Sequence, residues 1–276
     1  MGDAFRDNPQ HPLHGWWNAM RAQAATRASL GPKRGLTSTV AVLSFFTVAH
    51  DLFVLADNTE PRQRLLKALR VPDQFHGARY ELMIAACLVR AGFDFTFSDE
   101  DDLTSSHSDG TAVHKRTGKR YAVEMKTKGR PGVLGKAGER PSPDAMKGNV
   151  SRQLREALQK PAEDERLIFI DMNLPPGPPD WQGEGIWWQY DAVESKRAVE
   201  RQPGKAPADA TGFIVFTNMP SNQMPPDDYY IGLETAFTDY NKPGFAADMP
   251  LLGQAYPDIA DLFDAFRNHD LMPQTF

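Results

Sequence analysis

The sequence has one cysteine and no long hydrophobic run. Cys87 alone, among 276 residues, excludes a disulfide framework and any zinc site built on clustered cysteines. The longest apolar run, Val40 to Ala49, is followed by His50 and Asp51 and is shorter than the roughly 20 residues that a membrane span needs. The first residues are polar and charged, unlike a secretory signal, so we expect a soluble, cytoplasmic protein with no membrane partner.

Motifs of several common enzyme classes are also absent. The chain has no Gly-X-Ser-X-Gly segment, and Cys87 lies in an apolar segment, so a hydrolase with a serine or cysteine nucleophile is disfavoured. Gly135 and Lys136 are followed by Ala137 rather than by serine or threonine, which excludes a phosphate-binding loop of the P-loop type. The informative features are instead the charge pattern and a group of acidic residues.

The charge is distributed unevenly along a chain of ordinary globular composition. Hydrophobic residues make up 41% of the sequence and charged residues 24%. The net charge is −5, but residues 109–160 contain 13 lysines and arginines and 5 acidic residues, so the rest of the chain carries −13. A basic segment within an acidic protein indicates an anion-binding face, and a lysine-rich solvated surface is the alternative interpretation.

The hydrophobic pattern predicts a helical region followed by strands and helices in alternation. Helices are expected at 37–56, 62–70, 77–90, 149–160, 191–201 and 258–268, and strands at 93–97, 110–114, 119–127, 167–170 and 213–216. This order favours an α/β fold with a mixed central sheet. We expect a helical N-terminal cap over 1–72, an α/β core over 73–220, and a C-terminal extension over 221–276 whose last helix packs on the core.

One predicted strand places a carboxylate beside an ammonium group. Ala122, Glu124 and Lys126 alternate with apolar residues and therefore share one face of the strand. Such a pair can hold a divalent cation and steer a water toward a phosphate. Glu-X-Lys occurs by chance about once in a chain of this size. A second copy, Glu194 to Lys196, follows a helical pattern, and we reject it as a site.

Two further acidic residues accompany this pair. Asp109 opens the strand before a predicted hairpin turn, and the hairpin would bring it alongside Glu124. Two carboxylates this close disfavour each other's ionisation unless a cation binds between them. Glu81 heads an apolar helix face, where an unpaired charge is costly. A first-turn glutamate favoured by the helix dipole, or one paired with Arg79 or with a distant basic residue, is the alternative interpretation of Glu81.

These residues together resemble the PD-(D/E)XK nuclease superfamily over residues 77–171. The resemblance is carried, in chain order, by Glu81 on a helix, Ser108-Asp109, Glu124-Met125-Lys126 on a strand, and Gln153 on a basic helix. The resemblance implies the restriction-endonuclease-like αβββαβ core. In this chain Ser108 stands where the family has a proline.

The resemblance also implies hydrolysis of phosphodiester bonds with Mg²⁺, for which Mn²⁺ can substitute. The implied metal ligands are Asp109, Glu124, the backbone carbonyl of Met125, and the accessory carboxylate of Glu81. Lys126 would orient the attacking water and stabilise developing charge. Gln153 would support the site.

Basic residues near the motif would bind the phosphate backbone of a nucleic acid. They are Lys128, Arg130, Lys136, Arg140, Lys147, Arg152 and Arg155. We therefore expect an endonuclease or exonuclease acting on DNA in restriction, repair or phage defence, either as a homodimer or with a defence-system partner protein. The alternatives are a catalytically inactive nucleic-acid-binding module of the same fold and a protein-interaction component.

Overall fold

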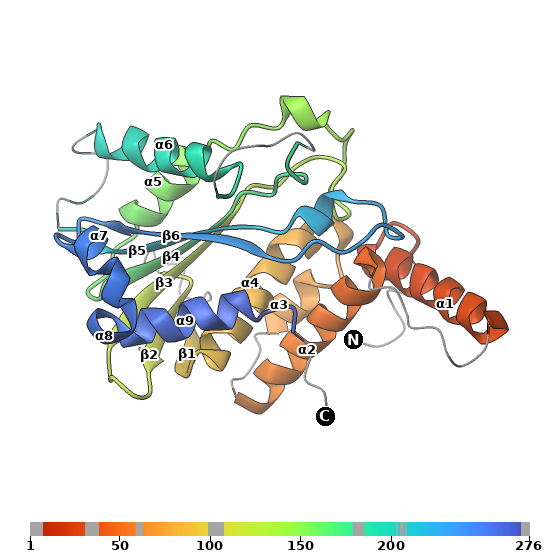
Figure 1. Ribbon diagram of the computed structural model, residues 1–276, viewed down its shortest axis with the longest axis horizontal. Coiled ribbons are helices and arrows are strands. Elements are labelled where there is room, and N and C mark those ends of the chain that lie inside the picture. The colour runs from red at the N-terminus through yellow and green to blue at the C-terminus, as the bar shows by residue number, and fades with distance from the viewer. Residues whose placement is uncertain are drawn as a thin grey trace.

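A six-stranded mixed sheet lies at the centre of the computed structural model, with strand order β1-β2-β3-β4-β5-β6 (Figure 1). The structure describes residues 8–30, 39–58, 63–98, 108–178 and 185–271, except 203, 205, 206 and 208. The strands are β1 (Phe93–Phe97), β2 (Gly110–His114), β3 (Arg120–Thr127), β4 (Glu165–Asp171), β5 (Gly212–Asn218) and β6 (Glu234–Tyr240). Strands β3, β4 and β5 run parallel, and the other neighbouring pairs are antiparallel.

Helices cover both faces of this sheet. The helices of the described residues are α1 (Pro12–Leu30), α2 (Val40–Asn58), α3 (Gln63–Ala68), α4 (Pro72–Arg90), α5 (Ser151–Gln159), α6 (Gln189–Glu200), α7 (Phe245–Asp248), α8 (Leu252–Ala255) and α9 (Pro257–Arg267). Short 3₁₀ turns occur at Pro143–Ala145, Pro220–Gln223 and Met249–Leu251. Helices α4 and α9 pack on one face, and α5 and α6 pack on the other (Figure 1). No helix in the described part of the chain combines the length and hydrophobicity that a membrane span needs.

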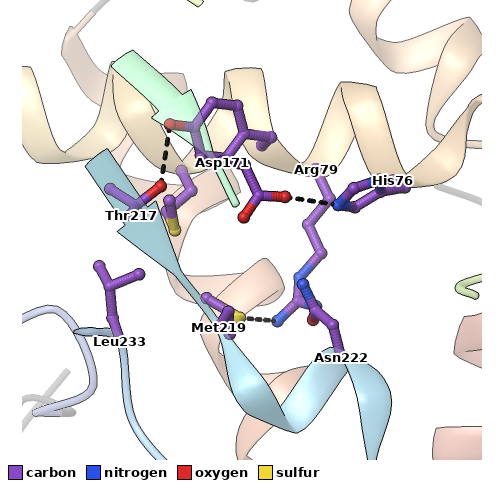
Figure 2. A pocket seen from close by; sticks show the side chains of 9 residues that line it. His76, Arg79, Asp171, Thr217, Met219, Asn222 and Leu233 are labelled. Atoms are coloured by element: carbon purple, nitrogen blue, oxygen red, sulfur yellow. Dashed lines mark hydrogen bonds and ion pairs between the residues drawn. The ribbon is translucent and has the colours of Figure 1, made fainter. Parts of the chain in front are cut away.

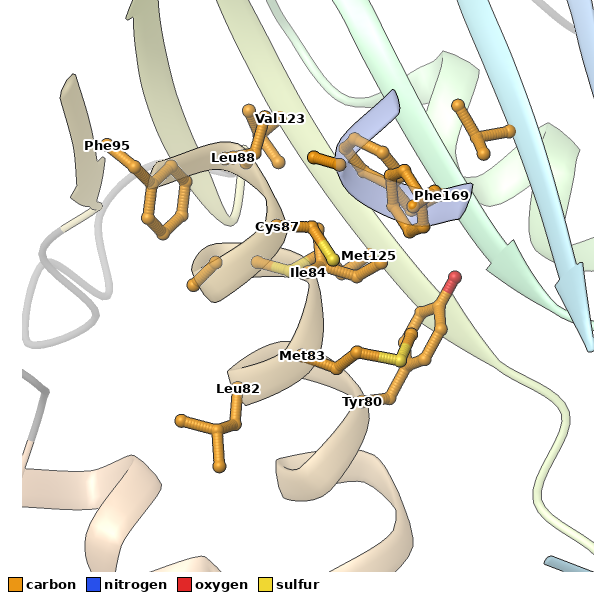
Figure 3. Packing of buried hydrophobic residues seen from close by; sticks show 14 of the residues in the cluster. Tyr80, Leu82, Met83, Ile84, Cys87, Leu88, Phe95, Val123, Met125 and Phe169 are labelled. Atoms are coloured by element: carbon orange, nitrogen blue, oxygen red, sulfur yellow. The ribbon is translucent and has the colours of Figure 1, made fainter. Parts of the chain in front are cut away.

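The alternation of side chains along the central strands creates two separate cores. Val123 and Phe169 belong to the core on the side of α4 and α9, and Figure 3 shows Val123 beside Leu88 of α4. Ile168 and Ile170 point the other way and pack under α5 and α6. Strand β4 is therefore apolar on both faces, as expected for a parallel strand covered by helices on each side.

The predicted α/β class and mixed sheet are confirmed. The order α4-β1-β2-β3-α5-β4 reproduces the predicted sequence of elements, although α4 begins at Pro72 rather than at 77. The core on the α4 side takes residues from all three predicted segments, for example Leu13, Val123 and Phe266, so the cap and the C-terminal extension pack into the same cluster. Strand β6 was not predicted. It is an edge strand, and its residues are half-buried up to Tyr240.

Candidate metal and phosphate site

The β2–β3 hairpin sets the position of the candidate site. Gly110 pairs with Val123 in antiparallel register, and Gly118 takes a positive φ of 70° in the turn, a conformation that glycine adopts without strain. The N–H of Asp109 donates to the carbonyl of Val123 at 2.9 Å, which extends the pairing by one residue. Asp109 therefore lies alongside Glu124, and this prediction is confirmed.

The carboxylates of Asp109 and Glu124 share one ammonium group. The Nζ atom of Lys160 lies 2.7 Å from Oδ1 of Asp109 and 3.0 Å from Oε2 of Glu124. Lys126 approaches the same Oε2 at 3.3 Å. The second oxygen of Asp109 accepts the N–H of Met125 at 2.7 Å. Two carboxylates from adjacent strands therefore lie within reach of a single cation.

Burial makes the charge of Glu124 costly. The residue is 1% exposed, and this burial, together with the negative charge of Asp109, raises the pKa of Glu124 to about 7, although Lys126 and Lys160 oppose the shift. Glu124 contacts the ammonium groups of Lys160 and Lys126 as ion pairs, through one of its two carboxylate oxygens. Burial would lower the pKa of Lys160, but the charges of Asp109 and Glu124 raise it above its ordinary value. The two acids are therefore held at short range by positive charge that lies between them.

The donor set at this point fits a hard divalent cation. The carbonyl of Val123 points toward Asp109, and that of Met125, two residues further along β3, points the same way. Mg²⁺ is commonly held by one or two carboxylates, with waters and substrate oxygens completing the shell. The described residues contain no group of three or more His, Cys, Asp or Glu side chains that could hold a metal. A cation here would therefore rely on Asp109, Glu124, the Met125 carbonyl, water and substrate.

The structure does not bring Glu81 to this site. Helix α4 packs on the sheet face occupied by Val123 and Met125, whereas Glu124 points to the opposite face. Glu81 itself is half-buried and lines a recess between α3 and α4 with Arg64. Because nearly every position of α4 from Phe75 onward is buried, its apolar pattern could not show which side carries Glu81.

Gln153 is placed on the same side of the sheet as the acid pair. It is a buried residue of α5, the helix that packs against β3 and β4. Lys160 follows it by seven residues, which is two helical turns, so the two side chains belong to the same side of the helix. Nothing in the sequence singled out Lys160, which lies directly after α5 and reaches the acids only through the packing of this helix on the sheet.

The prediction that Arg130 binds phosphate is wrong. Its guanidinium is buried and donates to the carbonyls of Asn173, Met172 and Lys147, so it holds the chain segment after β3 and cannot contact a phosphate. Lys128 is similarly engaged, since its Nζ donates to the carbonyls of Lys147 and Asn149 at 2.6 Å each. Burial also lowers the pKa of Lys128 to about 8.

The other predicted basic residues lie nearer to solvent. Lys147 and Arg152 are exposed, and Lys136 is half-buried. Arg152 contacts Glu156 of its own helix at 3.8 Å. The exposed Arg140 donates to a backbone carbonyl, and the half-buried Arg155 donates to a glutamine side chain. Of the seven basic residues predicted to bind phosphate, Lys136, Lys147 and Arg152 are therefore the ones whose side chains make no hydrogen bond to a backbone carbonyl or a glutamine in the described residues.

The second Glu-X-Lys copy lies on a helix, as predicted. Glu194 and Lys196 belong to α6. Glu194 pairs with Arg197 at 2.8 Å, and Lys196 contacts Glu200 at 3.3 Å and Asp239 at 3.6 Å. The two side chains of this copy therefore take different partners, in contrast to Glu124 and Lys126.

A polar network that the sequence did not indicate lies at the carboxyl ends of β4 and β5 (Figure 2). His76 of α4 contacts Asp171 at 2.8 Å, and Tyr80 bonds to Thr217 at 3.0 Å. Arg79 reaches the sulfur of Met219 at 3.0 Å. The carboxyl ends of parallel strands are common ligand sites. The cavity here holds about one water molecule, so these contacts fix α4 to the sheet.

Comparisons of the chain with protein-family models, with curated proteins and with solved structures found no match. The family resemblance of the motif therefore stays a prediction.

Proposed function

We propose that this protein is a metal-dependent nuclease that hydrolyses phosphodiester bonds, with DNA as its expected substrate. The observation that carries the proposal is the pair of carboxylates, Asp109 and Glu124, held within 3.0 Å of one shared cationic group. The order α4-β1-β2-β3-α5-β4 supports a restriction-endonuclease-like core around this pair.

Each residue of the site would have a different role in hydrolysis. Asp109, Glu124 and the Met125 carbonyl would hold Mg²⁺ or Mn²⁺. When bound, the ion supplies Lewis-acid polarisation of the phosphate and lowers the pKa of a water. Lys126, on the same strand face as Glu124, would orient that water and stabilise negative charge developing on the phosphate oxygens. Gln153 and the packing of α5 would keep the acids in place.

The backbone of the nucleic acid would bind to exposed basic residues near the site. Residues 109–160 carry a net charge of +8. Within this segment Lys147 and Arg152 are exposed to solvent, and Lys136 is half-buried. Binding through phosphate contacts releases counterions, so affinity should fall steeply as salt increases. We expect Lys147→Ala with Arg152→Ala to reduce this salt dependence, while leaving the folded structure intact.

The test is cleavage of plasmid, single-stranded and RNA substrates in Mg²⁺ or Mn²⁺. Asp109→Asn and Lys126→Ala should each lower the cleavage rate by roughly 100-fold or more, because each removes a group that acts on the reacting atoms. Lys196→Ala, in the second Glu-X-Lys copy, is the matched control and should cleave at the wild-type rate. Equal cleavage by all four forms would contradict the site assignment.

A catalytically inactive nucleic-acid-binding module is the second candidate function. It is favoured by one observation, namely that Lys160 already supplies positive charge to both acids. Salt-dependent binding of DNA or RNA without cleavage by any form would support this function. Failure to bind either nucleic acid at any salt concentration would instead point to a protein-interaction component.

A further inference from the structure

Lys160 lies where a divalent cation would bind, between the two acids. Its Nζ contacts one oxygen of Asp109 and one of Glu124, which are the same two side chains proposed to hold the metal. Glu124 is buried, and Lys126 approaches the same Oε2 atom at 3.3 Å, so one oxygen of this carboxylate already faces two ammonium groups. A buried carboxylate in this state gains from any cation that reaches it.

The ammonium group of Lys160 lies at a part of the site that is open to solvent. Its side chain is 23% exposed, and that of Asp109 is 29% exposed, so the pair opens to solvent on one side. Lys160 lies directly after α5, and its ammonium is at the end of a long, flexible side chain. Lys128, in contrast, donates to two backbone carbonyls and is fixed by them.

We infer that Lys160 is a displaceable internal cation: it neutralises Asp109 and Glu124 in the metal-free protein and competes with the divalent ion for the same oxygens. This inference rests on the proposed function, since it concerns the loading of the same metal site. Two cations cannot occupy one position between two carboxylates, so each must weaken the binding of the other. The displaced ammonium is then available to a phosphate of the substrate.

The first experiment measures the affinity of the full-length protein for Mn²⁺ alone, by the electron paramagnetic resonance signal of free Mn²⁺. Lys160→Met and Lys160→Gln should bind Mn²⁺ roughly tenfold more tightly than wild type, because the competing charge is gone. Lys160→Arg, which keeps the charge, and Lys196→Met, which removes a distant lysine, should bind as wild type does. Adding Asp109→Asn to Lys160→Met should abolish the gain.

A second measurement follows the wild-type protein itself and needs a variant, the charge-conserving Lys160→Arg, only to assign one resonance. The ¹⁵N-ammonium resonance of Lys160, assigned by its absence in Lys160→Arg, should be protected from exchange without metal and should lose this protection when Mg²⁺ is added. Binding of Mg²⁺ with no change in this resonance would overturn the inference. Lys160→Met and Lys160→Gln with wild-type or weaker Mn²⁺ affinity would overturn it as well.

The outcomes separate this inference from the nuclease proposal. Tighter Mn²⁺ binding by Lys160→Met, with no cleavage by wild type at saturating metal, would support the inference and refute the nuclease. Cleavage that depends on Asp109, with unchanged metal affinity in Lys160→Met, would do the reverse. Absence of Mn²⁺ binding by every form would refute both.

Discussion

Replacing Glu124 by glutamine should change how the stability of the protein depends on pH. The folded state raises the pKa of this carboxyl from an ordinary 4.5 to about 7, through burial first and the charge of Asp109 second. Between these two values the folded chain keeps a proton that the unfolded chain has released, so stability falls as pH rises. The loss is complete above the folded pKa and amounts to roughly 3 kcal/mol. The side-chain amide of the Glu124→Gln variant cannot ionise, so the variant escapes this loss.

The assay is urea unfolding of wild type and Glu124→Gln between pH 4 and pH 8, in a chelator that removes divalent cations. We expect the variant to gain about 3 kcal/mol relative to wild type across this range, with most of the gain above pH 5. Mg²⁺ added at pH 8 should stabilise wild type and leave Glu124→Gln unchanged, because a cation restores the ionised carboxylate. A stability difference that is the same at every pH would contradict a raised pKa of Glu124, since its carboxyl would then ionise at ordinary cost.

Three further predictions concern the fold. His269 is buried against Asp51 and Asp270; burial alone would lower its pKa, but the charges of the two acids raise it to about 9. The stabilisation from the protonated ring is therefore present below pH 6.5 and lost as pH rises through 9. His269→Asn should cost roughly 3 kcal/mol more at pH 6 than at pH 10 in urea unfolding. Arg130→Met should cost about 3 kcal/mol by the same assay, because buried carbonyls lose a charged donor, while DNA affinity of the folded variant stays unchanged. Leu154→Ala, at a fully buried position of α5, should cost about 2–5 kcal/mol, and a thermal midpoint equal to that of wild type would contradict the packing described for this helix.

Local patterns predicted most of the fold. Strands β1 to β5 were predicted because alternation, or a short apolar run between turns, is visible within each segment. The hairpin was predicted from the turn at Gly118, and with it the approach of Asp109 to Glu124. Strand β6 was not predicted from the sequence, because an edge strand is only half-buried and its residues, Glu234 to Tyr240, show no clear two-residue hydrophobic period.

The rest of the site depends on contacts between segments far apart in the chain. Lys160 lies 51 residues from Asp109, and only the packing of α5 on the sheet brings them together. Nothing in the sequence distinguishes Arg130 from an exposed arginine. In the structure its guanidinium donates to the backbone carbonyls of Met172 and Asn173, which follow β4. Glu81 sits on a helix that is buried on nearly all sides, so the spacing of its apolar residues could not give its direction.

The proposed function and the inference on Lys160 both require that Asp109 and Glu124 bind a divalent cation together. A crystal soaked with Mn²⁺ and measured for anomalous scattering shows directly whether they do. We expect an anomalous peak in contact with both carboxylates, with the Lys160 side chain moved away from them. Saturating Mn²⁺ that leaves Lys160 between the acids, with no peak at the pair, would contradict it.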